Sequence, residues 1–359
     1  MAARLLLLLL PFLVVLLVPP AAAANFTCRA SGRAARCQAL VGYTARNATN
    51  LAGVMALFQI RSFRSLLAAN GLDLSTPRSR LVPAGSTLRV RFSCSCSAGR
   101  GASAHRPLYR VVAGDNLDSI ARNVFDGLVT YQEIAVANNI SDPSLIQIGQ
   151  EVYIPLPCSC DEVEGHPVVH YAHLVAAGSS VSGIAEEFGT TEETLMSLNG
   201  ITDPKTLQAG QVLDVPLRVC SSAISNASLD SGLLVSNGSY ILTANNCVRC
   251  SCSSSSWELN CSPTQGISSS VCPVATCGAL SLGNSSSTGC ESTTCAYAGY
   301  TNSTSFNILA NLTTQSLCNT AGAPAPQPSG GFSLWVEAQS SYPLLLYVSL
   351  AMALLGWGS

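Results

Sequence analysis

The sequence predicts an α+β fold: three small β-α-α-β modules clamped by disulfides, followed by a cysteine-rich region of irregular or β structure. The first observation behind this prediction is a segment that occurs twice, at residues 109–158 and 171–220. Repetition of a whole segment indicates architecture more strongly than a single residue does. The second observation is a set of sixteen cysteines, which can staple modules too small to bury a large core.

The first half of each copy reads as a strand followed by a helix. A short β-favouring run, at residues 109–112 or 173–175, leads into a turn. The turn region is AGDNLDSIA around Gly114 in one copy and AGSSVSGIA around Gly178 in the other. Apolar residues then recur at helical spacing, namely Leu117, Ile120 and Ala121 in the first copy and Val181, Ile184 and Ala185 in the second.

The second half of each copy reads as another helix and a closing strand. The second helical stretch ends at Asn138 or Asn199. After Asp-Pro and Gly-Gln turns, the closing strand at 151–154 or 212–215 is expected to stop at a proline. These elements define two modules, at residues 109–157 and 171–217.

A fainter third copy lies upstream, within an N-terminal segment at residues 25–96. It lacks the Gly-Asp turn, with Ala48 and Thr49 in its place, and it lacks the closing proline. We therefore expect this degenerate module to be structural. The matching positions are Tyr43, Leu51, Val54, Leu66, Asn70, Gly71, Leu72, Pro83, Gly85 and Val90.

The N-terminus has the pattern of a secretory signal peptide at residues 1–24. Arg4 precedes an apolar run at residues 5–18, and Ala22 and Ala24 supply the small residues of a cleavage site. An uncleaved membrane anchor is the alternative. With either outcome, the chain enters the secretory pathway.

The C-terminus has the pattern of a glycosylphosphatidylinositol (GPI) attachment signal. The apolar stretch at residues 343–355 is shorter than the roughly 20 residues that span a bilayer. A linker at 319–342 offers the small residue Ser329 as the attachment site, and the tail at 343–359 would be removed. A marginal transmembrane helix and a soluble protein with an apolar tail are the alternatives.

Charge and cysteine content exclude several function classes. The net charge is -2 with 11% charged residues, so no basic patch favours nucleic-acid binding. Cys247, Cys250 and Cys252 have a spacing that zinc sites use, but a secreted chain favours disulfides there. We expect neither a metal nor a cofactor.

The cysteines divide into six in the repeat region and ten in the region at 220–318, and both numbers are even. The pairs Cys94/Cys96 and Cys158/Cys160 follow the ends of the first two modules, so they place sulfurs where modules meet. Spacing alone leaves fifteen pairings open for six cysteines.

The chain carries many acceptor sites for N-linked glycans, which indicates a heavily glycosylated surface. The predicted acceptors are Asn25, Asn47, Asn139, Asn226, Asn237, Asn284, Asn302 and Asn311. A further sequon, at Asn260, is doubtful because Cys261 is its middle residue.

Nothing in the sequence favours an enzyme. A glycan hydrolase needs two carboxylates placed across the scissile bond. The acidic residues instead fall on a linker and on outer helix faces: Asp161, Glu162, Glu164, Glu186, Glu187, Glu192 and Glu193. His166, His170 and His173 lie near Tyr171 without a catalytic motif, so we expect them to be strand and linker residues.

Two motifs resemble the LysM module, a binder of N-acetylglucosamine glycans. One is the Y-x-V-x-x-G-D-x-L-x-x-I-A pattern that begins at Tyr109, and the other is the N-G-I-x-D-P-x-x-L-x-x-G-Q pattern that begins at Asn199. With the C-x-C spacers and the lipid-anchor signal, the architecture resembles plant LysM receptor-like proteins that carry a GPI anchor. The resemblance implies the disulfides Cys28–Cys96, Cys37–Cys160 and Cys94–Cys158.

The resemblance also implies a function and partners. The ligands would be chitin oligosaccharides, peptidoglycan fragments or both, bound at the outer face of the plasma membrane. Signalling to plant immunity would pass through a LysM receptor kinase, and the chain would join homo- or hetero-oligomers with related receptor-like proteins. A non-signalling cell-wall protein and a lipochitooligosaccharide receptor are the alternatives.

We expect the glycan to lie in a shallow groove between two loops. In the second module these are Gly114, Asp115 and Asn116 with Asn139, Ile140, Ser141, Asp142, Leu145 and Ile146. The third module offers Gly178, Ser179, Gly200, Ile201, Thr202 and Asp203 as a secondary site, where Ser179 replaces the aspartate. For two further residues of this region we expect structural roles, Leu117 as core and Gly149 as a turn residue, and for Asp115 the alternative is a helix N-cap. A glycan on Asn139 would crowd the groove.

Overall fold

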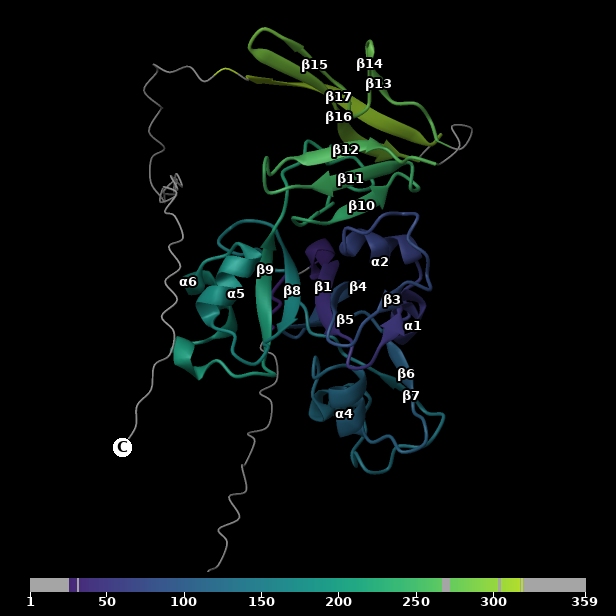
Figure 1. The fold of residues 1–359 in the computed structure, drawn as a ribbon, viewed down its shortest axis with the longest axis vertical. Coiled ribbons are helices and arrows are strands. Elements are labelled where there is room, and N and C mark those ends of the chain that lie inside the picture. Colours follow the sequence, from purple (N-terminus) through teal and green to yellow (C-terminus); the bar gives the residue numbers. More distant parts are fainter. Residues whose placement is uncertain (1–25, 31, 267–271, 303–304, 317, 319–359) are drawn as a thin grey trace, which may run out of the picture. The chain divides into compact units, whose positions relative to one another are not determined.

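The computed structural model describes residues 26–30, 32–266, 272–302, 305–316 and 318 (Figure 1). The predicted signal peptide, Asn25, Ser329 with its linker and the C-terminal tail lie outside the described residues. Within the described part of the chain, no helix is long and apolar enough to cross a membrane.

Each of the three modules has the predicted β-α-α-β order, and its two end strands pair antiparallel (Figure 1). Module 1 contains β1 (Arg36–Thr44), β2 (Thr49–Asn50), α1 (Leu51–Leu57), α2 (Phe63–Ala69), β3 (Leu81–Val82) and β4 (Thr87–Ser97), with the 3-10 helix η1 (Gly32–Ala35) before it and β5 (Arg100–Ser103) after it. Module 2 contains β6 (Leu108–Arg110), α3 (Leu117–Ser119), the π-helix η2 (Ile120–Val124), α4 (Tyr131–Ala137) and β7 (Glu151–Tyr153). Module 3 contains β8 (Val168–Leu174), α5 (Val181–Phe188), α6 (Glu192–Asn199), the 3-10 helix η3 (Pro204–Thr206) and β9 (Val212–Arg218).

The predicted apolar stripe of the first helix faces the core in modules 2 and 3. Leu117 and Ile120 are buried in module 2, and Val181 and Ile184 are buried in module 3. Leu117 is therefore a core residue, as expected. Polar residues begin these helices because they satisfy backbone N–H groups that lack partners within the helix.

Modules 1 and 3 share one five-stranded sheet, in the order β5-β4-β1-β8-β9. Strand β1 pairs parallel with β8, and Leu40 lies opposite Tyr171 in that register. Leu40 also joins the apolar core of module 3, while the core of module 1 is continuous with that of module 2. The three modules therefore form one body rather than a flexible string. The repeat pattern did not predict this parallel pair.

The prediction that proline stops the last strand of module 3 is wrong. Strand β9 continues through Pro216, which lies opposite His170, and ends at Arg218. Proline lacks a backbone N–H and is tolerated where a strand has no neighbour on one side. Strand β9 is the edge of its sheet, so the missing donor interrupts no ladder.

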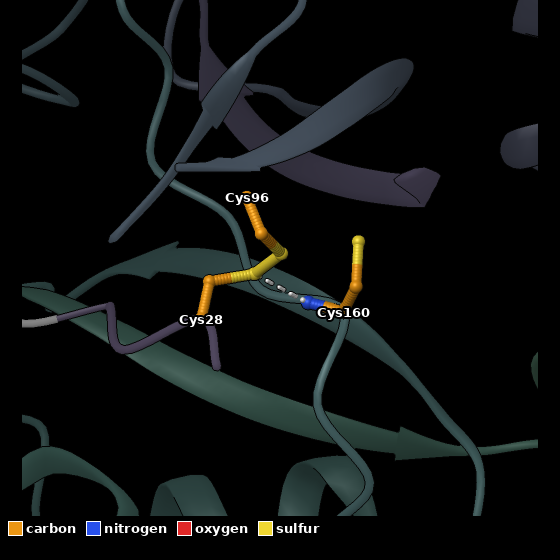
Figure 2. A group of neighbouring side chains, drawn as sticks. All are labelled: Cys28, Cys96 and Cys160. Atoms are coloured by element: carbon orange, nitrogen blue, oxygen red, sulfur yellow. Dashed lines mark hydrogen bonds between the residues drawn. A yellow bond between two sulfur atoms is a disulfide. The ribbon is translucent and has the colours of Figure 1, made fainter. Parts of the chain in front are cut away.

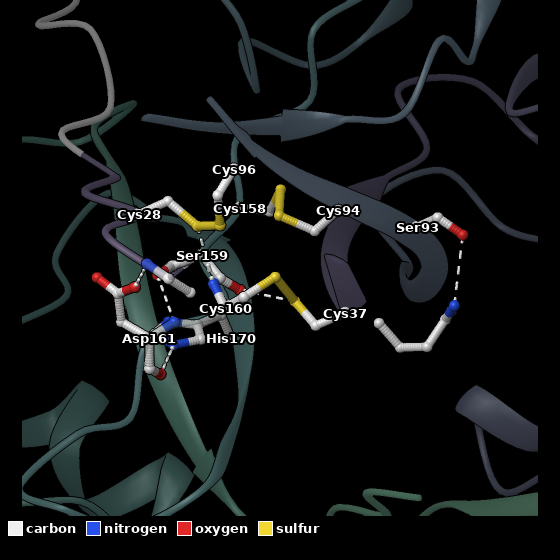
Figure 3. Close-up of a disulfide and its surroundings, with 12 residues drawn as sticks. Cys28, Cys37, Ser93, Cys94, Cys96, Cys158, Ser159, Cys160, Asp161 and His170 are labelled. Atoms are coloured by element: carbon white, nitrogen blue, oxygen red, sulfur yellow. Dashed lines mark hydrogen bonds between the residues drawn. A yellow bond between two sulfur atoms is a disulfide. The ribbon is translucent and has the colours of Figure 1, made fainter. Parts of the chain in front are cut away.

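Three disulfides connect the modules near the ends of β1 and β4, as Figure 3 shows. They are the pairs that the resemblance implies: Cys28–Cys96, Cys37–Cys160 and Cys94–Cys158. Cys94 and Cys158 are buried in a small apolar cluster with Ala39. The cross-links close loops of 64 to 123 residues in the chain.

The region after Cys220 is β structure, one of the two forms expected for it. Its strands form small antiparallel sheets joined by four disulfides, Cys220–Cys252, Cys247–Cys272, Cys250–Cys261 and Cys277–Cys295. Cys290 and Cys318 are disulfide-bonded as well. The strands are β10 (Tyr240–Thr243), β11 (Val248–Cys252), β12 (Leu259–Pro263), β13 (Thr276–Cys277), β14 (Leu280–Ser281), β15 (Ser285–Thr288), β16 (Glu291–Thr301) and β17 (Asn307–Ser316).

This C-terminal region docks on module 1. Tyr240 donates a hydrogen bond from its hydroxyl to Leu72 O at 2.6 Å, and Arg89 Nη1 donates to Asn237 O at 3.4 Å. A side-chain carbon added to Gly71 would lie 2.8 Å from Gly238 O, so only glycine fits this approach.

Candidate functional site

The same pair of backbone hydrogen bonds joins the two candidate loops in every module. In module 2, Val111 N donates to Gln150 O at 2.9 Å and Gly149 N donates to Val111 O at 2.8 Å. Gly149 has a φ of +85°, which confirms its expected role as a turn glycine. The equivalent pairs are Ala45 with Ser86 and Gly85 in module 1, and Val175 with Gln211 and Gly210 in module 3. The bases of the two loops therefore lie side by side in all three modules.

An asparagine fixes the second loop to the closing strand in each module. Asn138 Nδ2 donates to Ile134 O at 2.8 Å and to Tyr153 O at 2.7 Å, and its Oδ1 accepts from Tyr153 N. One side chain thus satisfies a helix end and a strand at once. Asn70 and Asn199 make the same three bonds in modules 1 and 3.

In the first loop of module 2, the carboxylate of Asp115 is used within the protein. Its Oδ2 accepts from Val112 N at 2.8 Å and from the hydroxyl of Tyr109 at 3.0 Å. Burial and this hydrogen bond raise the pKa of Tyr109 to about 12. The helix N-cap is Asn116, which forms a capping box with Ser119, so the alternative of Asp115 as N-cap is wrong. Asp115 thus shapes the loop, while Gly114 and Asn116 are exposed.

The second loop of module 2 combines anchored and exposed apolar side chains. Ile140 and Ile146 are half-buried against the core. Leu145 is 71% exposed and Ile148 is 73% exposed. Ile148 was not among the predicted residues, although an apolar residue beside the Gly-Gln turn is the signal that could have found it. The two exposed side chains give this loop an apolar surface open to a ligand.

Three polar residues complete the second loop. Asn139 is exposed and has a φ of +55°. The equivalent residues of modules 1 and 3, Gly71 and Gly200, have the same left-handed conformation. Asp142 Oδ1 accepts from Ser144 N at 2.9 Å and from Ser144 Oγ at 2.6 Å, and these bonds lower the pKa of Asp142. Ser141 is exposed beside it. The aspartate therefore holds a turn that presents the apolar pair.

The loops of module 3 have the same backbone but a more polar surface. Ser180 caps α5, Ser179 and Gly178 are exposed, and Asp203 Oδ1 accepts from Lys205 N at 2.9 Å. Gly200 caps α6 with a φ of +64°, Ile201 packs against the core, and Thr202 is exposed. Thr206 and Ala209 stand where module 2 has Leu145 and Ile148.

The second loop of module 1 is in contact with the C-terminal region. Leu72 occupies the position of Ile140, and its carbonyl accepts the hydroxyl of Tyr240. This contact places the C-terminal region against the second loop of module 1. Among the three modules, module 2 thus has the most open and apolar loop surface.

Two groups of cysteine sulfurs have the close spacing of a metal site, but all of these sulfurs are in disulfides. The sulfurs of Cys28, Cys96 and Cys160 lie within 4.8 Å of one another, as do those of Cys37, Cys94 and Cys160. Figure 2 shows the first group, in which Cys28 and Cys96 are joined and Cys160 N donates to Cys28 Sγ at 3.1 Å. All of these sulfurs are in disulfides, as are those of Cys247, Cys250 and Cys252, whereas zinc takes cysteine as the thiolate.

A buried ionisable pair lies beside the disulfides (Figure 3). His170 Nδ1 is 2.8 Å from Asp214 Oδ1, and His170 Nε2 is 2.8 Å from Asp161 O. The Asp161 carbonyl can only accept, so Nε2 donates to it, and an ionised Asp214 accepts from Nδ1 of a charged imidazole. Burial raises the pKa of Asp214 and the charge of His170 opposes this effect. Burial opposes this charge, but the Asp214 carboxylate outweighs it and raises the pKa of His170. Both residues are 1% exposed, so the pair lies inside the protein.

Comparisons with known proteins found a matching family model and several similar proteins. The family model described as "LysM domain" matches residues 109–155 and 173–216. The chain is 46% identical over 329 residues to a "Chitin elicitor-binding protein" from Oryza sativa subsp. japonica, covering 90% of this chain and 91% of the relative. It is 42% identical to "LysM domain-containing GPI-anchored protein 2" from Arabidopsis thaliana, covering 92% and 91%. A solved receptor-like kinase ectodomain aligns over 53% of this chain and 94% of its own, at 21% identity and a TM-score of 0.44.

Proposed function

Because the chain belongs to the family of LysM domain-containing GPI-anchored proteins, we propose that it is a cell-surface receptor for N-acetylglucosamine glycans. Its GPI anchor, at Ser329, holds it on the outer leaflet of the plasma membrane. The observation that carries the proposal is the pair of exposed apolar side chains, Leu145 and Ile148, on the second loop of module 2.

The chemistry of this loop suits the ligand. The acetamido group of N-acetylglucosamine has one donor, one acceptor and a methyl group. Exposed backbone around Gly114 and Asn139 supplies the polar partners, and Leu145 with Ile148 receives the methyl group. Module 3 offers a secondary site at Gly178, Ser179 and residues 200–203.

The ligands are chitin oligosaccharides and peptidoglycan fragments, because both repeat N-acetylglucosamine along the chain. The printed name of the rice relative supports chitin. A single shallow site gives modest affinity, so a polymer that crosses two receptors gains through avidity. A longer oligosaccharide therefore favours assembly into homo- or hetero-oligomers with related receptor-like proteins.

The receptor signals to plant innate immunity through a partner that crosses the membrane, a LysM receptor kinase. Glycan need only bind the complex more tightly than the separate receptors in order to shift the equilibrium toward assembly. The partner is tested by co-isolation of the full-length chain and a LysM receptor kinase from cells treated with and without chitin oligosaccharide. Equal co-isolation in both samples would contradict ligand-driven assembly.

The binding itself is tested by calorimetry on the protein purified with its disulfides formed. Chitin oligosaccharides of increasing length and soluble peptidoglycan fragments are the titrants, and cellulose oligosaccharides, which lack the acetamido group, are the control. We expect saturable binding that strengthens with chitin length. Absence of binding to both N-acetylglucosamine ligands would remove the receptor function.

A further inference from the structure

A cavity of about 850 Å³ lies between module 1 and the C-terminal region. It is bordered by β1, β4, the α1–α2 connection and the segment before β6 on one side, and by residues 229–234 and Ile241 of β10 on the other. None of the proposed glycan-binding residues lines it. Six of its lining side chains define its chemistry: Arg36, Arg61, Arg91 and Arg106, with Phe58 and Phe92.

The walls of the cavity are fixed by contacts outside it. Tyr240 binds Leu72 O, and the guanidinium of Arg249 lies 3.9 Å from the centre of the Tyr240 ring. Arg89 binds Asn237 O from the neighbouring part of β4. The cavity is therefore preformed, and a ligand needs little ordering of the protein in order to bind.

The cavity has a positive charge that the protein does not neutralise. Arg91 is only partly exposed on β4, and within the described residues it has no ion pair with a carboxylate. Burial lowers the pKa of Arg91 to about 10 and no acidic neighbour opposes this effect. Arg36 and Arg61 are exposed and also have no ion pair in the described part of the chain, and Arg106 Nη1 donates to a neutral group, Gln59 Oε1, at 3.0 Å.

The one carboxylate among the described lining residues is already occupied. Asp230 Oδ2 accepts from Thr243 Oγ1 at 2.6 Å and from the hydroxyl of Tyr297 at 2.7 Å, while its Oδ1 accepts from Ser228 Oγ. These bonds hold Asp230 within the C-terminal region. The guanidinium of Arg91 is partly shielded from water and has no carboxylate partner among the described residues, so an anion that enters the cavity gains a strong interaction.

We propose that this cavity is a binding site for a carboxylate-bearing organic anion, separate from the glycan loops. The fork of a guanidinium matches the two oxygens of a carboxylate, and four such groups suit a ligand with more than one. The half-buried ring of Phe92 receives the apolar part of the ligand. The volume lies within the range of small-molecule sites, roughly 300–1,000 Å³. The carboxylates belong either to uronic-acid oligosaccharides or to the peptide stem of a muropeptide.

The test is calorimetry on the full-length protein with trigalacturonic acid and with a muramyl tripeptide, each at low and at high salt. We expect saturable binding of at least one anion, weaker at high salt. In Arg91→Gln and in Arg61→Gln its Kd should rise about tenfold, because a charge-assisted bond is lost. Arg64→Gln is the matched control, since it removes the same charge from an exposed position of α2 outside the cavity.

A chitin oligosaccharide should bind the wild type and the three variants equally, so this arm separates the cavity from the glycan loops. Binding of the uronate alone or of the muropeptide alone would identify the source of the carboxylates. Failure of both anions to bind, or equal affinity in wild type and Arg61→Gln, would overturn the proposal. The exposed Arg61 keeps the test valid even where Arg91→Gln impairs folding.

Discussion

At the scale of single residues, an asparagine at the equivalent position of each module makes the same three hydrogen bonds. Asn70, Asn138 and Asn199 each donate two hydrogen bonds and accept one, between the end of a helix and the closing strand. No other side chain of this size carries both two donors and an acceptor. The repeat therefore keeps asparagine where the loops begin.

The substitution Asn138→Asp should destabilise the protein by about 2 to 4 kcal/mol, because an ionised carboxylate cannot donate to Ile134 O and Tyr153 O. Denaturant unfolding with disulfides intact measures this free energy. Gln132→Glu makes the same change from an amide to a carboxylate at an exposed position of α4, so it is the control and should change stability by less than about 0.5 kcal/mol. Equal stability of the two variants would show that the asparagine bonds are not needed.

His170 should make stability depend on pH. Its pKa in the folded protein is raised above the unfolded value of about 6.5. The contribution of the His170–Asp214 pair is thus fully present below about pH 6.5 and is lost as pH rises through the folded pKa. The unfolding free energy, measured from pH 5 to pH 9, should therefore decrease as the pH rises above about 6.5. In His170→Gln the fall should be smaller, and an unchanged profile would contradict the charged pair.

At the scale of elements, the repeat pattern predicted the order of the helices and strands better than the residues at which they end. It located the buried stripes of α3 and α5 because apolar spacing follows the helical period. It ended the last strand at Pro216, since proline is read without knowledge of which strand is an edge. It also missed Ile148, whose exposure depends on how the second loop folds over its turn.

Each disulfide should raise the free energy of unfolding by an amount that grows with the length of the loop it closes. Cys94–Cys158 has a sequence separation of 64 and Cys250–Cys261 one of 11. Chain entropy gives about 4 kcal/mol for the first and about 3 kcal/mol for the second. Calorimetric unfolding of the double variants Cys94→Ala with Cys158→Ala and Cys250→Ala with Cys261→Ala measures the two losses of stability. A larger loss on removing Cys250–Cys261 would show that loop closure is not the governing effect.

At the scale of the whole molecule, the modules and the C-terminal region act on one another. The parallel pairing of β1 with β8 merges modules 1 and 3, and Tyr240 occupies the loop of module 1. Neither contact has a local signal, because each joins segments more than a hundred residues apart. Sequence patterns therefore predicted the three modules and a structural role for module 1, but not the contact of Tyr240 with the loop of module 1. The open, apolar loop of module 2 is the reason that we propose it as the principal glycan site.

The most direct measurement of this account is calorimetry with a long chitin oligosaccharide on wild type, Leu145→Asp and Thr206→Asp. The two substitutions place the same charge at equivalent exposed positions of modules 2 and 3. We predict that Leu145→Asp weakens binding about tenfold or more, because the acetamido methyl group loses its apolar partner, while Thr206→Asp changes the Kd by less than about threefold. Equal losses in both variants, or a loss confined to Thr206→Asp, would contradict module 2 as the principal glycan site.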